Sequence, residues 1–341
     1  MRITLVTPIA VPSVRGNAVT VNRLWRALGE RGVAAEVVDL SRTPAEAVAE
    51  RLAGLAPDVV HAFHAFRGAP AAVPFTRARG VPLVVSLTGT DANHDLLDPE
   101  RRPAIVTALR AARALIAFHE TIRARVAREV PEVADRVEII PQSVVLGEDP
   151  YPLSAVAPRR AGEVRFLLPA GIRRVKNVLF ALEPLGALAR RYPIRFLVVG
   201  PVIEEEEGAR LRAALKGADW ASYLGEVPHP QMGSLLDQVD VVVNSSLSEG
   251  GMANSVLEAM VRAKPVLAAD IEGNRSVIEH GVDGLLYRTA GEFLQGAERL
   301  VGDPALRARL GSAARARVTR LYPPERELDA HLDLYRRLTM R

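Results

Sequence analysis

The sequence has no cysteine among its 341 residues. Structural disulfides, thiolate metal sites and cysteine nucleophiles are therefore excluded. No apolar run approaches the roughly 18 residues that a membrane-spanning helix needs. The chain opens on strand-like residues, Ile3–Val6, without a charged leader and long apolar segment. We therefore expect a cytoplasmic protein, with peripheral contact to an acidic membrane surface through the N-terminal half as an alternative.

Aromatic residues and lysine are also scarce. Aromatic side chains make up 5% of the chain, and only three of its 44 basic residues are lysine. The net charge is +4, and the arginines are spread throughout the sequence. Nucleic-acid binding typically requires clustered basic residues with interleaved aromatics. We therefore expect no nucleic-acid partner. For the oligomeric state, the sequence is compatible with a monomer or a homodimer.

Several well-known site motifs are absent. The sequence has no G-x-G-x-x-G, Walker A, G-x-S-x-G or H-E-x-x-H pattern. These absences argue against a dinucleotide cofactor, a P-loop, a hydrolase elbow and a zinc protease. His61, His64 and Asp91 could be taken for metal ligands, but a single spacing of three within a loop is insufficient evidence for a metal site. We expect no metal and no tightly bound cofactor.

Apolar runs of strand length alternate with longer amphipathic stretches in both halves of the chain. Such runs, read as strands buried on both faces, are typical of parallel βαβ units. The expected strands are 3–7, 35–38, 59–61, 83–87, 115–118, 137–140, 165–168, 195–199, 221–224, 241–244, 265–269 and 284–287. The pattern predicts an α/β protein with two Rossmann-like parallel-sheet domains that face each other across a cleft.

The domain limits follow from breaks in this pattern. We expect a first domain over 1–150, a second over 151–322, and a proline- and glycine-containing linker over 146–162. A last helix over 323–341 follows Pro323-Pro324, and we expect it to cross back to the first domain. Ligands of such folds bind at the carboxyl ends of the strands, where the informative residues are to be sought.

The most informative stretch runs from Asn244 to Met260. An apolar strand leads into small polar residues, then Glu249, a Gly-Gly turn and an apolar helix that carries Glu258. Glycine allows the backbone to approach a ligand closely, and the free N–H groups at a helix start suit a phosphate. Glu258 lies one turn into the helix, where it could accept ribose hydroxyls, and Glu249 could bind a sugar hydroxyl or cap the helix. This layout indicates a nucleotide-sugar site.

A second candidate loop is 171–177, which follows the first strand of the second domain. Arg173 and Lys176 stand three positions apart, so both could reach a diphosphate. Fixed cations there would stabilise the charge that accumulates on a leaving diphosphate. Lys176 is the stronger indication, because a lysine in an arginine-rich chain suggests that a compact ammonium is required.

Other candidates are individually weaker. Gly16-Asn17 lies between the first strand and the first helix, where backbone N–H groups could approach an anion. The turn around Glu226 could contact a nucleobase or serve only as a turn. In the first domain, polar residues that end strands could contact an acceptor or a sugar, or serve in packing: His61, His64, Thr90, Asp91 and His119.

Together, 244–260, Lys264–Ala268 and Gly281–Leu286 resemble glycosyltransferase family 4 of the GT-B fold. The 171–177 loop and Gly16-Asn17 extend the resemblance over nearly the whole chain. Within that family, the sequence is most similar to proteins called glycosyltransferase 1 domain-containing and to bacterial selenosugar synthases.

The resemblance implies a nucleotide-diphosphate sugar donor, habitually a UDP-sugar, and retention of configuration by a front-face reaction without an enzyme nucleophile. It implies that Arg173 and Lys176 hold the diphosphate, Glu258 the ribose and Glu249 the donor sugar, with Gly16 approaching from the first domain. It also implies that the loop backbone holds the sugar and phosphates through Gly250, Gly251, Met252, Ala253, Asn254, Ser255 and Val256.

Two departures from the family pattern leave alternatives. Glu249 and Glu258 lie nine positions apart, one more than is usual, and a histidine common in the family is absent at 88–90. His61 or His64 could replace that histidine. A selenosugar synthase that uses selenophosphate as acceptor, a sugar-nucleotide epimerase and a non-catalytic nucleotide-sugar binder are the rival hypotheses.

Overall fold

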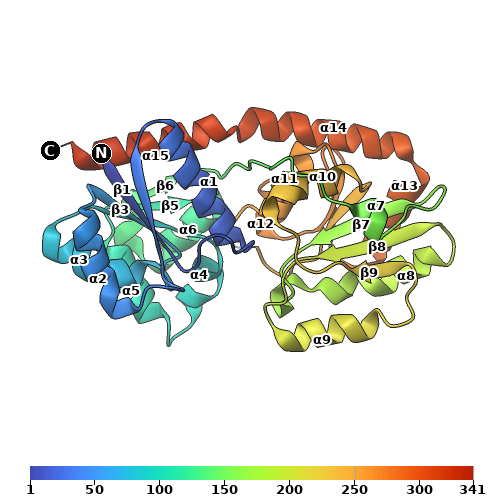
Figure 1. Ribbon diagram of the computed structural model, residues 1–341, viewed down its shortest axis with the longest axis horizontal. Helices are drawn as coiled ribbons and strands as arrows, with labels where there is room; N and C mark the ends of the chain where they lie inside the picture. Colours follow the sequence, from blue (N-terminus) through green and yellow to red (C-terminus); the bar gives the residue numbers. More distant parts are fainter. Residues whose placement is uncertain (250, 341) are drawn as a thin grey trace. The chain divides into compact units, whose positions relative to one another are not determined.

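The computed structural model describes residues 1–249 and 251–340, which fold into two compact units. The first unit comprises Met1–Ser143 and the chain from Tyr322 onward, and Gly251 and Met252 group with it. The second comprises Val144–Glu249 and Ala253–Leu321. Each unit is built around a six-stranded parallel sheet (Figure 1).

The sheet of the first unit has the order β2-β1-β3-β4-β5-β6. Its strands are β1 (Arg2–Thr7), β2 (Ala34–Asp39), β3 (Val59–Phe63), β4 (Leu83–Ser86), β5 (Ala114–Ala117) and β6 (Val137–Ile139). Its helices are α1 (Gly16–Glu30), α2 (Val48–Leu55), α3 (Ala69–Arg79), α4 (Thr90–Asn93), α5 (Arg102–Ala111), α6 (Glu120–Glu129) and α15 (Pro324–Thr339), with 3-10 turns η1 (Ala45–Ala47), η2 (Asp95–Leu97) and η3 (Pro131–Arg136).

The sheet of the second unit has the order β12-β11-β10-β7-β8-β9. Its strands are β7 (Val164–Pro169), β8 (Ile194–Val199), β9 (Ala221–Tyr223), β10 (Val241–Asn244), β11 (Val266–Ala269) and β12 (Leu285–Tyr287). Its helices are α7 (Leu153–Val156), α8 (Leu182–Ala189), α9 (Glu205–Ala214), α10 (Met232–Asp237), α11 (Asn254–Val261), α12 (Glu272–Arg275), α13 (Ala290–Gly302) and α14 (Pro304–Leu321), with 3-10 turns η4 (Arg174–Lys176), η5 (Val178–Ala181) and η6 (His229–Gln231).

These sheets confirm the predicted fold class. Each of the twelve expected strands is present within two residues of its predicted bounds, and the pairings within both sheets are parallel. Every residue of β3, β4, β5 and β10 is buried, as expected for strands that carry helices on both faces.

One face of the first sheet is covered by α1 and α15 (Figure 1). Leu24 and Leu28 of α1 and Leu328, Leu332 and Tyr335 of α15 share a core with that face. Their three- and four-residue spacing gives each helix an apolar stripe. The other face carries α2, α3, α5 and α6.

A buried ion pair fastens α15 to α1. Arg23 donates from Nε and Nη2 to the two carboxylate oxygens of Glu327, at 3.1 and 2.9 Å, and Ser143 donates its backbone N–H to Glu327 at 3.0 Å. Both side chains of the pair are less than one tenth exposed. The helix that follows Pro323 is therefore an integral part of the first unit.

The segment 146–162, expected as a linker, packs within the second unit and contains the short helix α7. Leu153 is fully buried, and the backbone N–H of Tyr151 donates to Ser234 at 3.0 Å. Arg165 of β7 reaches back to the carbonyl of Ala157 at 2.7 Å. Prolines and glycines here shape an irregular but ordered segment.

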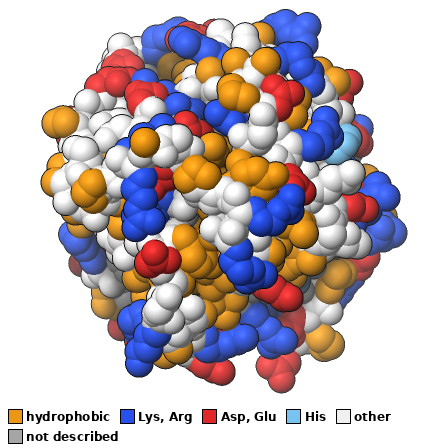
Figure 2. Space-filling view, turned by 90° about the vertical axis from the view of Figure 1, so that its right-hand side faces the viewer, with side chains coloured by type: hydrophobic (Ala, Val, Ile, Leu, Met, Phe, Trp, Pro, Cys, Tyr) orange, Lys and Arg blue, Asp and Glu red, His pale blue; other side chains and the backbone are white. Residues whose placement is uncertain are grey.

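No helix among the described residues is both long and apolar enough to span a bilayer. On the face shown in Figure 2, basic side chains alternate with acidic and apolar ones and do not gather into a single patch.

Candidate functional site

The candidate site is centred on two adjacent strands of the second sheet, β7 and β10. The loop after β7 turns through Asn177, whose backbone is left-handed (φ 47°), a conformation that asparagine tolerates better than most residues. Two hydrogen bonds join this loop to the one after β10: Leu247 N–H donates to Val175 O at 2.9 Å, and Ser245 Oγ donates to Lys176 O at 2.9 Å. The two loops are therefore held together.

This connection brings Lys176 and Glu249 into an ion pair. Lys176 Nζ contacts Oε1 of Glu249, and the side chains are 17% and 11% exposed. Ser246 Oγ and Asn244 Nδ2 donate to the same oxygen at 2.6 and 3.3 Å. A lysine and a glutamate 73 positions apart are thus paired in a largely buried but still accessible position at the strand ends.

The pairing sets the charge state of Glu249. Burial alone would raise the pKa of this carboxyl, but the Lys176 ammonium and the hydrogen bonds from Lys176, Ser246 and Asn244 together hold its pKa below the ordinary value. Glu249 is therefore ionised at neutral pH and accepts hydrogen bonds rather than donating them.

Arg173 is half-buried and immediately precedes η4. Its carbonyl accepts the backbone N–H of Lys176 at 2.9 Å, which closes the turn that holds the two basic residues. The next residue, Arg174, is exposed, and its N–H donates to Glu204 at 2.9 Å.

Glu258 lies in the second turn of α11, among fully buried apolar neighbours. Its side chain is 7% exposed, and its Oε1 lies 2.9 Å from Nε2 of His229 in η6. A carboxylate so deeply buried needs such a partner. No local sequence pattern predicts a role for His229, because its partner Glu258 lies 29 positions away. Glu226, the residue in the preceding turn that the sequence does suggest, is exposed.

The loop before α11 is closely packed. Met252 and Ala253 are buried, and Gly251 lies beside them. Ala253 is the N-cap and has no side-chain acceptor for the first N–H groups of α11, which begins at Asn254 with Ser255 and Val256. Gly250, also a predicted donor contact, lies outside the described residues.

In the first unit, Gly16 begins the long helix α1, with Asn17 next to it, so the predicted anion-facing position is a helix N-terminus. The predicted acceptor residues have other surroundings. His61 is fully buried in β3, where Nδ1 pairs with Tyr335 OH at 2.6 Å and Nε2 with Ser86 Oγ at 2.8 Å. Both ring nitrogens are engaged inside the unit, which supports packing, one of the two roles that the sequence leaves open for His61.

Asp91 and His64 organise the loops after β3 and β4. Asp91 is fully buried and accepts backbone N–H groups from Ala65, Thr88, Gly89 and Ala92. His64 Nδ1 accepts the N–H groups of residues 66 and 67, at 3.3 and 3.2 Å. Both side chains therefore hold the backbone of these loops in place.

Two other predicted residues lie at helix starts in the first unit. Thr90 begins α4, and His119 precedes α6 and is 9% exposed. Among the residues that the structure describes, no cluster of three or more His, Cys, Asp or Glu side chains has the arrangement of a metal site.

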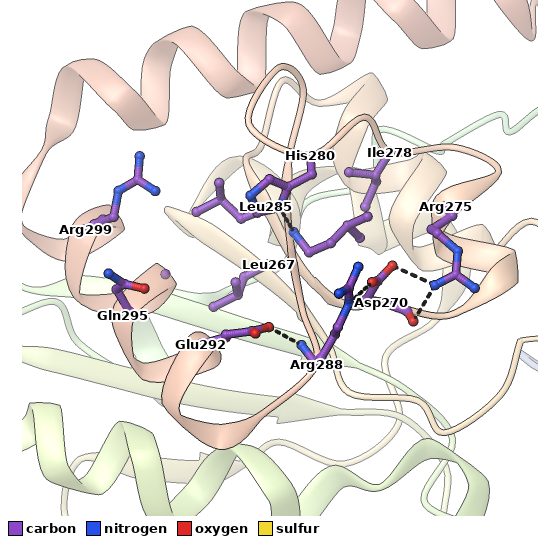
Figure 3. A pocket seen from close by; sticks show the side chains of 12 residues that line it. Leu267, Asp270, Arg275, Ile278, His280, Leu285, Arg288, Glu292, Gln295 and Arg299 are labelled. Carbon is purple, nitrogen blue, oxygen red and sulfur yellow. Dashed lines mark hydrogen bonds and ion pairs between the residues drawn. The ribbon is translucent and has the colours of Figure 1, made fainter.

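A separate cavity of about 610 Å³ lies beside the edge strand β12 (Figure 3). Arg275 and Arg288 both contact Asp270 there, at 2.8 and 2.6 Å, and the backbone N–H of Arg288 donates to Glu292 at 2.7 Å. None of the predicted site residues lines this cavity. The side chains of Arg275 and Arg288 share the carboxylate of Asp270, and Arg299 also lines the cavity.

Comparisons with known proteins identify relatives of both halves of the chain. A family model described as glycosyl transferases group 1 matches residues 163–303, and one described as glycosyltransferase family 4 matches residues 39–148. A Xenopus tropicalis protein named glycosyltransferase 1 domain-containing protein 1 is 30% identical over 268 residues, covering 76% of this chain and 77% of that protein.

Solved structures show the same architecture. Sucrose-phosphate synthase from Thermosynechococcus elongatus superposes with a TM-score of 0.85 at 17% identity, covering 99% of both chains. Anabaena HepE, solved in complex with UDP, gives a TM-score of 0.77 at 18% identity, covering 99% of this chain and all of that one. At such identities the likeness is one of fold.

Proposed function

Because the chain belongs to the glycosyltransferases of family 4, with the GT-B fold, we propose that it transfers a sugar from a UDP-sugar to an acceptor with retention of the anomeric configuration. The observation that carries the proposal is the Lys176–Glu249 ion pair at the strand ends of the second unit. UDP as the nucleotide is supported by HepE, a fold relative whose structure contains it.

Lys176 is the electrostatic half of this site. When the bond between the sugar C1 and the phosphate oxygen breaks, negative charge accumulates on the departing diphosphate. An ammonium held beside that oxygen stabilises the transition state more than the bound donor, which is the condition for faster chemistry. Arg173, on the same turn, adds a second cation.

Glu249 is the orienting half. Its carboxylate is ionised and anchored through Oε1 by Lys176, Ser246 and Asn244. In that state it can accept a hydrogen bond from a hydroxyl of the donor sugar and oppose the positive charge that develops on the ring. It also keeps Lys176 in place before the donor arrives.

The proposed chemistry needs no covalent enzyme intermediate. The C1–O bond to the leaving phosphate breaks, the acceptor atom bonds to C1 on the same face, and the acceptor proton passes to a phosphate oxygen. Glu258, in α11, would accept the ribose hydroxyls, while the N-terminal N–H groups of α11 would face the phosphates.

The test is Lys176→Ala, with donors first chosen by thermal-shift screening against a panel of sugar nucleotides. We expect UDP release to fall by about 100-fold or more, with the fold intact, because one preorganised charge is removed. Lys216→Ala is the matched control, since Lys216 is exposed on the same unit. Wild-type rates in Lys176→Ala would contradict the proposal.

The same assay separates the rival reactions. UDP released only when selenophosphate is present would indicate a selenosugar synthase. Conversion of UDP-GlcNAc to UDP-ManNAc without an acceptor would indicate an epimerase. Donor binding without turnover for any acceptor offered would favour a non-catalytic binder.

A further inference from the structure

The hydrogen bond between His229 and Glu258 joins two elements that sequence alone does not bring together. His229 begins η6, and Glu258 belongs to α11. Nε2 of the imidazole lies 2.9 Å from Oε1 of the carboxylate. The histidine side chain is 25% exposed and the glutamate side chain 7%, so the pair opens to solvent on the histidine side.

The chemistry of the two groups fixes the direction of this bond. An ionised carboxylate only accepts hydrogen bonds, so Nε2 of His229 must carry the proton and donate it. Oε1 of Glu258 is then engaged, and the carboxylate plane can no longer turn freely about its terminal torsion. The position of Oε2 is set by a residue in another element.

We propose that His229 is a positioning residue for the donor nucleoside: it holds Oε1 of Glu258 so that Oε2 accepts a ribose hydroxyl. The inference rests on the proposed function, because it assumes that a ribonucleotide occupies this site. Without the histidine, the Glu258 side chain would rotate among several positions, and the ligand would have to immobilise it on binding. Preorganisation of this kind improves affinity by lowering that ordering cost.

A purely structural role is the competing explanation, in which His229 only ties η6 to α11. The two roles differ in what they do to ribose recognition. A structural tie affects every nucleotide alike, whereas a positioning residue affects only nucleotides that carry ribose hydroxyls.

The experiment measures binding of UDP and of 2′,3′-dideoxyuridine diphosphate by calorimetry. The proteins are the full chain and its His229→Ala, His229→Gln and Gln231→Ala variants. Glutamine is informative because its Nε2 stands as many bonds from the backbone as Nε2 of histidine. Gln231 is the matched control, since it lies in the same turn and donates to Pro150 O at 3.2 Å instead of to Glu258.

We expect His229→Ala to weaken UDP binding by about tenfold, the effect of losing one charge-assisted hydrogen bond. Binding of the dideoxy nucleotide should change by less than about twofold. His229→Gln should recover most of the UDP affinity, and Gln231→Ala should match wild type. In turnover, His229→Ala should raise the donor KM and leave kcat nearly unchanged, because the ribose contact is the same in ground and transition states.

Each alternative result has a distinct meaning. Equal losses for both nucleotides in His229→Ala would overturn the positioning role while leaving the proposed function intact. Equal wild-type affinity for both nucleotides would remove Glu258 from ribose recognition and overturn the inference with it. A wild-type chain that binds neither nucleotide would overturn the proposed function itself. Thermal melts of each variant exclude misfolding as the cause of a loss.

Discussion

Two ion pairs between a glutamate and a distant basic residue are built in different ways in this molecule. In the first unit, Arg23 and Glu327 both lie in helices, and Arg23 engages both carboxylate oxygens. In the second unit, Lys176 and Glu249 lie in loops, and three donors converge on Oε1 of the glutamate. Arginine's planar fork suits the first arrangement, and the compact ammonium of lysine suits the second.

The difference between the two pairs shows that a Glu–basic ion pair can serve either to hold helices together or to bind a reacting ligand. The side chains of the Arg23–Glu327 pair are only 8% and 7% exposed, and the pair joins α1 to α15, so its expected role is to hold α15 in place. The Lys176–Glu249 pair is partly open at the strand ends, where ligands of such folds bind. The first should therefore control stability, and the second should control activity.

The largest effect should come from Glu327→Ala. Removing one partner of a buried pair leaves an uncompensated charge, so the first unit should lose about 3–5 kcal/mol of unfolding free energy. Trp25 and Trp220 lie in different units, so a Trp220→Phe background lets Trp25 fluorescence report the first unit during urea unfolding. A loss below about 1 kcal/mol would break the comparison.

Glu249→Gln should affect activity in the way that Glu327→Ala affects stability. We expect transfer to fall by about 100-fold, because glutamine cannot supply the negative charge that orients Lys176 and opposes charge on the sugar. The second unit, followed through Trp220 in a Trp25→Phe background, should lose only about 1 kcal/mol. Near-normal turnover would show that the Lys176–Glu249 pair has only a structural role.

Mild acid should weaken the first unit through two buried histidines. Burial lowers the pKa of His61 well below the ordinary value of histidine, about 6.5, and His331 adds to the effect. Burial also lowers the pKa of His331, although Glu327 opposes the shift. Below about pH 6.5 the two histidines are therefore protonated in the unfolded chain while they stay neutral in the folded chain. The free energy of unfolding consequently falls as the pH falls.

The expected slope is about 1.4 kcal/mol per pH unit for each histidine, in the window between its unfolded and folded pKa values. Urea unfolding of the Trp220→Phe protein at pH 7.5 and 5.5 measures it. His331→Asn retains a donor near the Glu327 carbonyl and should roughly halve the slope. An unchanged slope in that variant would assign the pH dependence elsewhere. Glu327, whose pKa is lowered because Arg23 outweighs its burial, adds a further loss only at lower pH.

The smallest effect should come from Arg31→Ala. Arg31, immediately after α1, pairs with Asp329 of α15 at 3.0 Å, but both side chains are about half exposed. Solvent screens such a pair, so the first unit should lose less than about 1 kcal/mol. A loss equal to that of Glu327→Ala would mean that burial does not explain the contrast.

Sequence patterns were sufficient for the two sheets, because each strand is a local apolar run with a helix after it. The strand β10 could be predicted residue for residue as 241–244. The ordered packing of 146–162 could not, since it depends on the burial of Leu153 and on the hydrogen bond from Tyr151 to Ser234, 83 positions later. Prolines and glycines locally resemble a linker whether or not such contacts exist.

In the candidate site, too, the sequence predicts individual residues but not the long-range contacts between them. Lys176 and Glu249 each stood out by residue type and position, but their pairing depends on the adjacency of β7 and β10. For His61, at a strand end, the sequence leaves a sugar contact and packing both open. It could not predict that Nδ1 lies 2.6 Å from the hydroxyl of Tyr335, 274 positions later. Polar residues at strand ends indicate a region, whereas tertiary partners decide which of them reach a substrate.

The return of α15 to the first unit has a consequence for biosynthesis. All residues of the second unit, Val144–Glu249 and Ala253–Leu321, are made before α15. The first unit is begun earlier but finished last: Arg23 and His61 lack Glu327 and Tyr335 until α15 has been made. A nascent chain therefore carries an unfinished N-terminal domain with an exposed apolar face, and a stop codon shortly before α15 would damage the domain most distant from it in sequence.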